Sequence, residues 1–175
     1  MFGFRKLAGC ALVAGTVVLS GCTSLFMGKQ YEFPRADEPS ATVRLKYGSG
    51  TTLDAITFSE KTCYAGFTPL PYNGEYIESK VAVDKELVLN YTNVVGGAQC
   101  QIPFAFTPQA GATYLVKSGF WSETKPGLIP VLNHDQYHCG IVVMKKVGDQ
   151  ESVQPIQQLR MRTGFPCLRF LPLEK

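Results

Sequence analysis

The sequence is poor in the residues and motifs from which most catalytic and metal sites are built. It has one tryptophan and two histidines in 175 residues, and it contains no CxxC or HExxH spacing. It also lacks a G-x-S-x-G elbow, a Walker sequence and a complete dinucleotide-binding fingerprint. No motif therefore supports a zinc-ribbon site or a hydrolase, nucleotidase or dinucleotide enzyme. We expect a protein that is not an enzyme and that holds no cofactor.

Charge is sparse, and no apolar run is long enough to cross a bilayer. The 17 basic and 14 acidic residues give a net charge of +3, with no concentrated basic stretch. Nucleic-acid binding requires such a stretch or face, so no nucleic-acid partner is expected. The longest apolar segment, 7–20, has 14 residues, whereas a membrane-spanning helix needs about 20. No helical periodicity follows residue 22.

The apolar segment is instead typical of an export signal. Arg5 and Lys6 precede it, and its length fits the hydrophobic region of a secretory signal peptide. It ends in Leu19-Ser20-Gly21-Cys22, which resembles the lipobox of bacterial lipoproteins. An ordinary cleavage site at Ala14-Gly15-Thr16 is the alternative. Removal of this signal, with Arg5 and Lys6, would leave a chain with 15 basic and 14 acidic residues and a net charge of +1.

The lipobox resemblance implies a location. It makes residues 1–21 a lipoprotein signal peptide and Cys22 the site of a thioether-linked diacylglycerol, with acylation of the new amino group. Thr23, in place of an aspartate, implies the periplasmic face of the outer membrane. Residues 22–40 include Pro34 and Pro39, lack periodicity and are predicted to form a lipidated tether.

Residues 41–175 are predicted to form one all-β domain. Apolar and polar residues alternate with period two, for example with Val43, Leu45 and Tyr47 on one face. Glycine- and proline-containing turns separate the alternating segments, which span 41–47, 53–59, 77–83, 86–91, 99–107, 112–121, 138–146 and 152–159. About eight short strands predict an antiparallel β-sandwich or an open barrel.

Four cysteines are predicted to form two disulfides. Export would place Cys63, Cys100, Cys139 and Cys167 in an oxidising compartment. Four cysteines allow three pairings. If consecutive strands run up and down, all four fall at one end of the domain, beside two long connections (64–75 and 122–137). This arrangement favours Cys100–Cys139 together with Cys63–Cys167, whereas a Greek-key crossing would change the neighbours.

One segment of the domain resembles a known group of proteins. IPFAFTPQAGATYLVKSGF is similar to segments of small, mostly uncharacterised proteobacterial lipoproteins, in which F-x-x-x-x-G-x-x-Y-x-V joins two strands of a β-sandwich. The matching positions are Phe106, Gly111, Tyr114 and Val116. The resemblance implies the same fold and no particular activity.

Aromatic and basic residues provide candidates for a partner-binding surface. They are Phe67, Tyr72, Tyr76, Trp121, Arg160 and Arg162. Aromatic side chains are enriched at protein interfaces, and the arginines are suited to anionic head groups or a protein partner. Alternatively, the rings cap an open end of the sandwich and the arginines belong to a solvated tail.

The leading hypothesis is a non-enzymatic outer-membrane lipoprotein that is anchored by lipid and binds an envelope protein or glycan. The rival hypothesis is a small-ligand or metal-binding module. His134 and His138 lie four residues apart around Asp135, a spacing that on a helix would direct both imidazoles to one metal ion. Otherwise this segment is a polar loop that leads into a strand.

Overall fold

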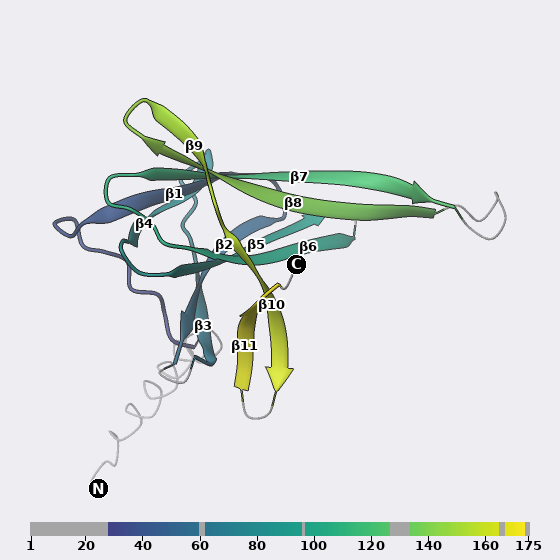
Figure 1. Cartoon of the computed structure of the whole chain (residues 1–175), viewed down its shortest axis with the longest axis horizontal. Helices are drawn as coiled ribbons and strands as arrows, with labels where there is room; N and C mark the ends of the chain where they lie inside the picture. Colours follow the sequence, from purple (N-terminus) through teal and green to yellow (C-terminus); the bar gives the residue numbers. More distant parts are fainter. Residues whose placement is uncertain (1–27, 60–61, 96, 127–133, 165–166, 174–175) are drawn as a thin grey trace, which may run out of the picture.

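The computed structural model of the chain describes residues 28–59, 62–95, 97–126, 134–164 and 167–173. The predicted signal peptide, 1–21, and the predicted lipidation site, Cys22, lie outside the described residues. The described part contains no helix, and therefore none long and apolar enough to cross a membrane. Its strands form two packed sheets (Figure 1). The predicted all-β sandwich is confirmed.

The first sheet has five strands in the order β4-β1-β7-β8-β9. Their bounds are β1 (Ser40–Lys46), β4 (Tyr76–Ala82), β7 (Thr113–Lys125), β8 (His134–Val147) and β9 (Gln150–Gln154). Strand β1 runs parallel to β7, with Thr42 paired to Thr113, and the other neighbours are antiparallel. The parallel pair is the one departure from the expected antiparallel arrangement among the described residues.

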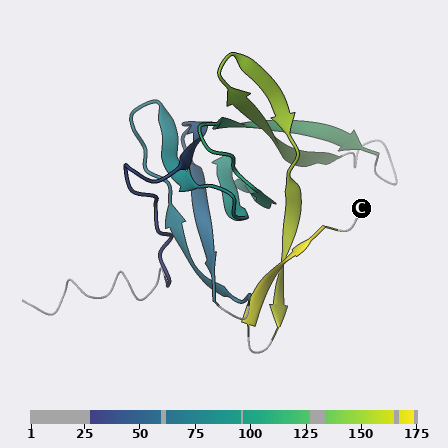
Figure 2. The same ribbon diagram turned by 60° about the vertical axis from the view of Figure 1, so that its left-hand side comes forward.

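The second sheet has six strands in the order β11-β10-β6-β5-β2-β3, and its neighbouring strands are antiparallel. Their bounds are β2 (Thr51–Phe58), β3 (Tyr64–Pro69), β5 (Leu87–Val95), β6 (Ala98–Phe106), β10 (Gln157–Gly164) and β11 (Cys167–Pro172). The sheet is strongly curled, so that β3 and β11, its two edges, approach each other (Figure 2).

The main core lies between the two sheets and follows the predicted alternation. Val43 and Leu45 are buried on the inner face of β1, while Tyr47, just after the strand, is exposed. Among the largest fully buried side chains are Tyr91 and Tyr114. The Tyr114 hydroxyl accepts a hydrogen bond of 2.9 Å from the backbone N–H of Gln109. This bond satisfies the polar end of a buried aromatic residue.

The described residues form eleven strands rather than about eight, because two regions predicted to be irregular form strands and the predicted strand 152–159 is divided between β9 and β10, which belong to different sheets. Part of the expected connection 64–75 is β3, and most of the expected tail 160–175 belongs to the hairpin β10–β11. The connection 122–137 was also expected to be a loop. Its described residues instead extend β7 and β8 as a two-stranded ladder; residues 127–133 lie outside the described residues.

The favoured disulfide pairing is confirmed. Cys63 bonds to Cys167, with their Cα atoms 5.4 Å apart, and Cys100 bonds to Cys139, with a Cα separation of 6.2 Å. The first bridge joins the two edges of the six-stranded sheet. The second bridge joins β6 of that sheet to β8 of the five-stranded sheet.

The expectation that both disulfides share one end of the domain is wrong. Cys100 pairs in register with Asn93, and Asn93 pairs with Thr51 at the start of β2. Cys63, in contrast, follows the end of β2. The unpredicted strand β3 reverses the chain once more before β5 and β6, so β5 runs antiparallel to β2 and the two bridges lie toward opposite ends of β2.

Residues 28–40, within the predicted tether, lie against the domain. The backbone N–H of Lys29 donates to the carbonyl of Ala65 in β3 at 2.8 Å. Tyr31 receives a hydrogen bond of 3.0 Å at its hydroxyl from the Ala82 N–H, and its own N–H donates to Thr68 Oγ1 at 2.7 Å. This segment therefore links β3 of one sheet to β4 of the other.

Candidate functional site

The hairpin of β7 and β8 extends beyond the rest of its sheet (Figure 1). Strand β1 pairs with β7 only at 113–116, and β9 pairs with β8 only at 143–147. Residues 117–125 and 134–142, here called the ribbon, therefore pair only with each other within the described structure. The outer edges of both ribbon strands present backbone N–H and C=O groups that no neighbouring strand uses.

Large aromatic side chains are exposed on this ribbon. Trp121 is 51% exposed and Tyr137 is 68% exposed. The Trp121 ring stacks on the His138 ring, with centroids 5.6 Å apart and planes at 14°. It also lies over Gly140, where an added Cβ would come within 3.3 Å of the indole. The absence of a side chain at Gly140 thus lets Trp121 lie flat on the ribbon in one orientation.

The base of the ribbon is fixed to the second sheet. Cys139 pairs in register with Phe120 and is bonded to Cys100 of β6. Because side chains alternate along a strand, Phe120 and Cys139 face the second sheet, whereas Trp121 and His138 face away from it. The ribbon therefore carries an aromatic side chain on each face and is covalently held at its base.

The structure does not support a metal site built from the two histidines. His134 and His138 both lie in strand β8 rather than in a helix, and four residues of a strand span about 13 Å. His138 Nε2 instead lies 3.7 Å from a carboxylate oxygen of Glu123. Within the described residues, no three His, Cys, Asp or Glu side chains are grouped closely enough to hold a metal ion.

The other predicted partner residues are separated from Trp121. Tyr72 is 53% exposed and packs on Tyr47, and Tyr76 lies under the Arg44 guanidinium, 5.2 Å from its ring centroid. Both tyrosines lie at the β4 edge, across the sheet from the ribbon. Phe67 points into the curled sheet and lines a pocket there.

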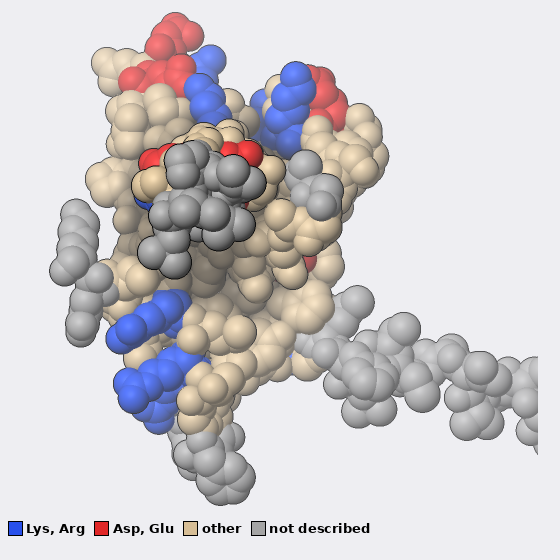
Figure 3. Space-filling view, turned by 90° about the vertical axis from the view of Figure 1, so that its right-hand side faces the viewer, with Lys and Arg blue, Asp and Glu red and all other residues tan. Residues whose placement is uncertain are grey.

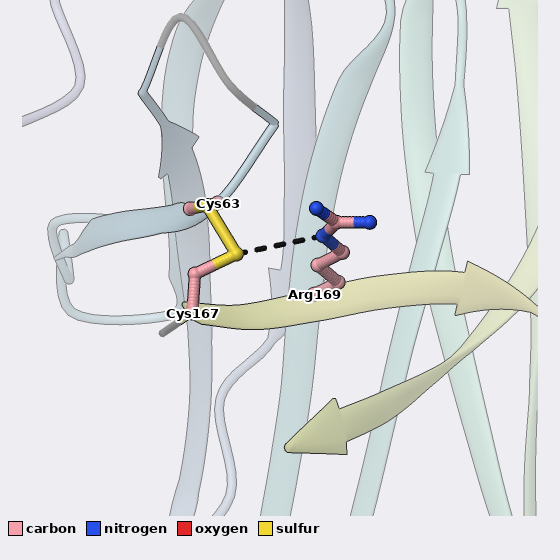
Figure 4. Close-up of a disulfide and its surroundings, with 3 residues drawn as sticks. All are labelled: Cys63, Cys167 and Arg169. Atoms are coloured by element: carbon pink, nitrogen blue, oxygen red, sulfur yellow. Dashed lines mark hydrogen bonds between the residues drawn. A yellow bond between two sulfur atoms is a disulfide. The ribbon is translucent and has the colours of Figure 1, made fainter. Parts of the chain in front are cut away.

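The two predicted arginines lie on the β10–β11 hairpin. Arg160 and Arg162 are two residues apart on β10, and Arg162 pairs across the strands with Arg169. All three side chains are exposed and share the outer face of the hairpin. Arg169 folds back so that its Nε donates to the sulfur of Cys167 at 3.4 Å (Figure 4). Figure 3 shows basic side chains at the margin of a hollow lined mainly by uncharged residues.

A pocket of about 400 Å³ lies on the face of the six-stranded sheet that points away from the main core. It forms because the sheet curls until its two edges meet. The Cys63–Cys167 bridge joins these edges. The ring of Phe170 in β11 contacts the rings of Phe58 and Tyr64, with centroid distances of 6.0 and 6.2 Å. A second small apolar cluster packs inside this curl; it contains Ile56, Val88, Ala105 and Leu159. The pocket has the size and the mainly apolar lining of a small-molecule site.

Two polar side chains, Asp54 and Asn90, are directly paired across β2 and β5 and line this pocket. Thr52 Oγ1 donates to Asp54 Oδ2 at 3.2 Å, and Asn90 Nδ2 donates to Thr92 Oγ1 at 3.1 Å. Asn90 is 8% exposed, and its Oδ1 accepts no hydrogen bond from any described residue. Native proteins rarely leave a buried acceptor without a donor.

The surroundings of this pair make ionisation of the Asp54 carboxyl less favourable than in water. Burial raises the pKa of the Asp54 carboxyl above its ordinary value, and hydrogen bonds with Thr52 and Asn90 offset only part of this effect. Burial, together with the negative charge of Asp54, also raises the pKa of the Tyr64 phenol. Tyr64 therefore stays protonated near neutral pH and presents an O–H donor at the same pocket.

Asp54→Asn is expected to increase thermal stability at pH 7. Because the folded-state pKa of Asp54 is raised, folding is disfavoured by its ionisation above the unfolded pKa of about 4. The gain should be absent below the unfolded-state pKa of about 4, grow as the pH rises toward the folded-state pKa, and level off above the folded-state pKa. Melting temperatures of both proteins from pH 3 to 8 would measure it. A variant that is less stable than the parent at pH 7 would contradict this expectation.

The pocket could not be recognised from the sequence pattern. Asp54 and Asn90 alternate with core residues such as Leu53, Leu89 and Tyr91, so each sits where an exposed polar residue is expected. Only the curl of the sheet and the register between β2 and β5 bring the two polar side chains together under cover.

The chain matches no model of a known protein family, and the comparisons with curated proteins and with solved structures give no match either.

Proposed function

We propose that this chain is a non-enzymatic, lipid-anchored protein of the bacterial outer membrane whose β7–β8 ribbon binds an envelope partner. The observation that supports the proposal is the ribbon itself. Exposed, unpaired strand edges are an aggregation hazard that proteins normally cover or blunt. An edge that is retained beside ordered, exposed aromatic side chains is suited to pairing with a strand of another protein.

The aromatic residues indicate where binding energy would be concentrated. Hot spots of protein interfaces are enriched in tryptophan and tyrosine. Trp121 is already held flat by His138 and Gly140, so binding would cost little side-chain entropy. The Cys100–Cys139 bridge holds the ribbon at its base, which limits the backbone freedom lost on binding.

Site-specific crosslinking in living cells tests this proposal. A photoreactive phenylalanine analogue replaces Ser122 on the ribbon or, as the control, Lys80 on the β4 edge; both native side chains are exposed. We expect one adduct of discrete mass from position 122 and none from position 80. Conversion of the adduct by muramidase to the chain carrying a short glycan fragment would identify a glycan partner, and no adduct from the ribbon would contradict the proposal.

Trp121→Ala is expected to weaken binding of the crosslinked partner by about 30-fold, the effect of a hot-spot residue worth about 2 kcal/mol. Tyr72→Ala is the matched control because Tyr72 is exposed to a similar extent but lies at the β4 edge, across the sheet from the ribbon. Surface plasmon resonance with the identified partner would measure both variants. Equal losses in the two variants would show that the ribbon is not the binding surface.

A further inference from the structure

The Asp54–Asn90 pair is more polar than the fold requires. A partly desolvated carboxylate and a buried amide oxygen without a donor each lower stability. No described lysine or arginine forms an ion pair with Asp54. An apolar pair at these positions would pack against Ile56 and Val88 without that cost. The Asp54 carboxylate therefore lacks a positively charged hydrogen-bond donor among the described residues.

We propose that the pocket binds a small organic ammonium compound, with its N–H groups donating to the Asp54 carboxylate. Its apolar body would lie against the aromatic side of the pocket, formed by Phe67, Tyr64 and Phe170. Aromatic faces attract a desolvated ammonium group through the ring quadrupole. The proposal does not depend on the ribbon or on lipidation.

The composition of the pocket distinguishes this ligand from other classes. An anion would be repelled by Asp54. A calcium or magnesium ion needs six or more oxygen ligands, whereas the pocket offers one carboxylate beside mainly apolar side chains. A neutral apolar molecule would fit the walls but would leave the Asp54 carboxylate without a cationic partner. A volume of about 400 Å³ suits a compound at the small end of the usual range.

Calorimetric titration with three matched probes tests the proposal. The probes are 2-phenylethylammonium, neutral 2-phenylethanol and anionic 3-phenylpropionate, which share a phenyl ring and a two-carbon spacer. The full chain is used in lipid nanodiscs if it carries acyl chains and in buffer if it does not, since detergent would compete for the pocket. We expect the ammonium probe to bind at least about 10-fold more tightly than the alcohol, as a charge-assisted hydrogen bond provides, and the carboxylate not to bind.

Two variants connect this preference to the pocket. Asp54→Asn should reduce the ratio of ammonium to alcohol affinity to about one while leaving the alcohol affinity unchanged. Gln101→Lys, at an exposed position of the lining, should place an internal ammonium group near Asp54 and lower the affinity for the cationic probe at least 10-fold. Asp149→Asn removes an exposed carboxylate from the β8–β9 turn and is the control, with no change expected.

The outcomes are decisive in both directions. A cation preference that is lost in both pocket variants and kept in Asp149→Asn supports the site. Equal binding of all three probes, no binding of the ammonium probe, or a preference that survives Asp54→Asn in folded protein would overturn it. Trp121→Ala should leave the affinity for the ammonium probe unchanged, so failure of the ribbon proposal and failure of this one are separate results.

Discussion

Replacing Cys63 and Cys167 together by alanine should lower the free energy of unfolding by about 3 to 5 kcal/mol. The bridge closes a loop with a sequence separation of 104 residues, and cross-links over loops of this length restrict the unfolded chain by an amount worth about 4.7 kcal/mol. The loss should be large for a second reason. This bridge joins the two edges of the curled sheet, and within the described residues no backbone ladder joins β3 to β11.

Urea unfolding of the full chain, followed by circular dichroism, would measure the loss. The paired variant Cys100→Ala with Cys139→Ala is the control, because its shorter loop of 39 residues predicts a loss of about 4 kcal/mol. The two variants should differ at the pocket: only loss of Cys63–Cys167 should abolish binding of the ammonium probe. A free-thiol assay of the folded parent should find none of the four domain cysteines reduced. A change below 1 kcal/mol in the first variant would contradict the role given to the bridge.

The extent to which the fold is predictable depends on how each strand is covered. Strand β1 buries one face and exposes the other, so Val43 and Leu45 alternate with Arg44 and show the strand plainly. Strand β3 is a short edge strand whose outer edge is met by residues 28–31, and its sequence YAGFTP does not alternate. Alternation of apolar and polar residues indicates a sheet that is buried on one face. It does not reveal a sheet that bends back on itself.

The hairpin β10–β11 illustrates a different limit. Its sequence contains Arg160, Arg162 and Arg169 among apolar residues, which favours a solvated tail over a strand pair. In the structure the arginines occupy the outer face, while Met161 and Phe170 turn toward the pocket. The position of the hairpin against the rest of the sheet is set by the distant Cys63–Cys167 bridge and by contacts of Phe170 with Phe58 and Tyr64, and such long-range contacts leave no local pattern.

The candidate sites also differ in how far they can be predicted from the sequence. Trp121 could be selected from the sequence because a single tryptophan among turn residues is conspicuous, but its stacking on His138 required the β7–β8 register. The four-residue spacing of His134 and His138 suggested a metal because a helix was assumed, and a strand changes the separation. Asp54 and Asn90 carry no signal of their own, since a polar residue every second position is what any half-exposed strand shows.

The point at which the chain enters the domain bears on membrane attachment. Gly28 bridges to Gly66 of β3, and an added Cβ at Gly28 would lie 2.1 Å from the Ala65 carbonyl oxygen, so only glycine fits this close approach. Cys22 precedes Gly28 by six residues, and six residues span at most about 20 Å. A lipid on Cys22 would therefore hold the β3 end of the domain within about 20 Å of the bilayer and leave little free tether.

Cys22→Ser should convert a membrane-bound protein into one that carries no lipid and is unprocessed or mislocalised. Diacylglycerol is attached through the cysteine sulfur, and a serine hydroxyl is a much weaker nucleophile than a thiolate. Each buried methylene contributes about 0.8 kcal/mol to membrane binding, so two or three acyl chains anchor a protein firmly and their loss releases it. Cell fractionation and intact-protein mass spectrometry would measure both effects.

Cys10→Ser is the matched control, because Cys10 lies inside the apolar segment predicted to be removed, and its product should be identical to the parent. A parent protein with ordinary cleavage and no acyl mass would refute the lipobox interpretation, while the pocket and ribbon predictions would still be tested by their own variants.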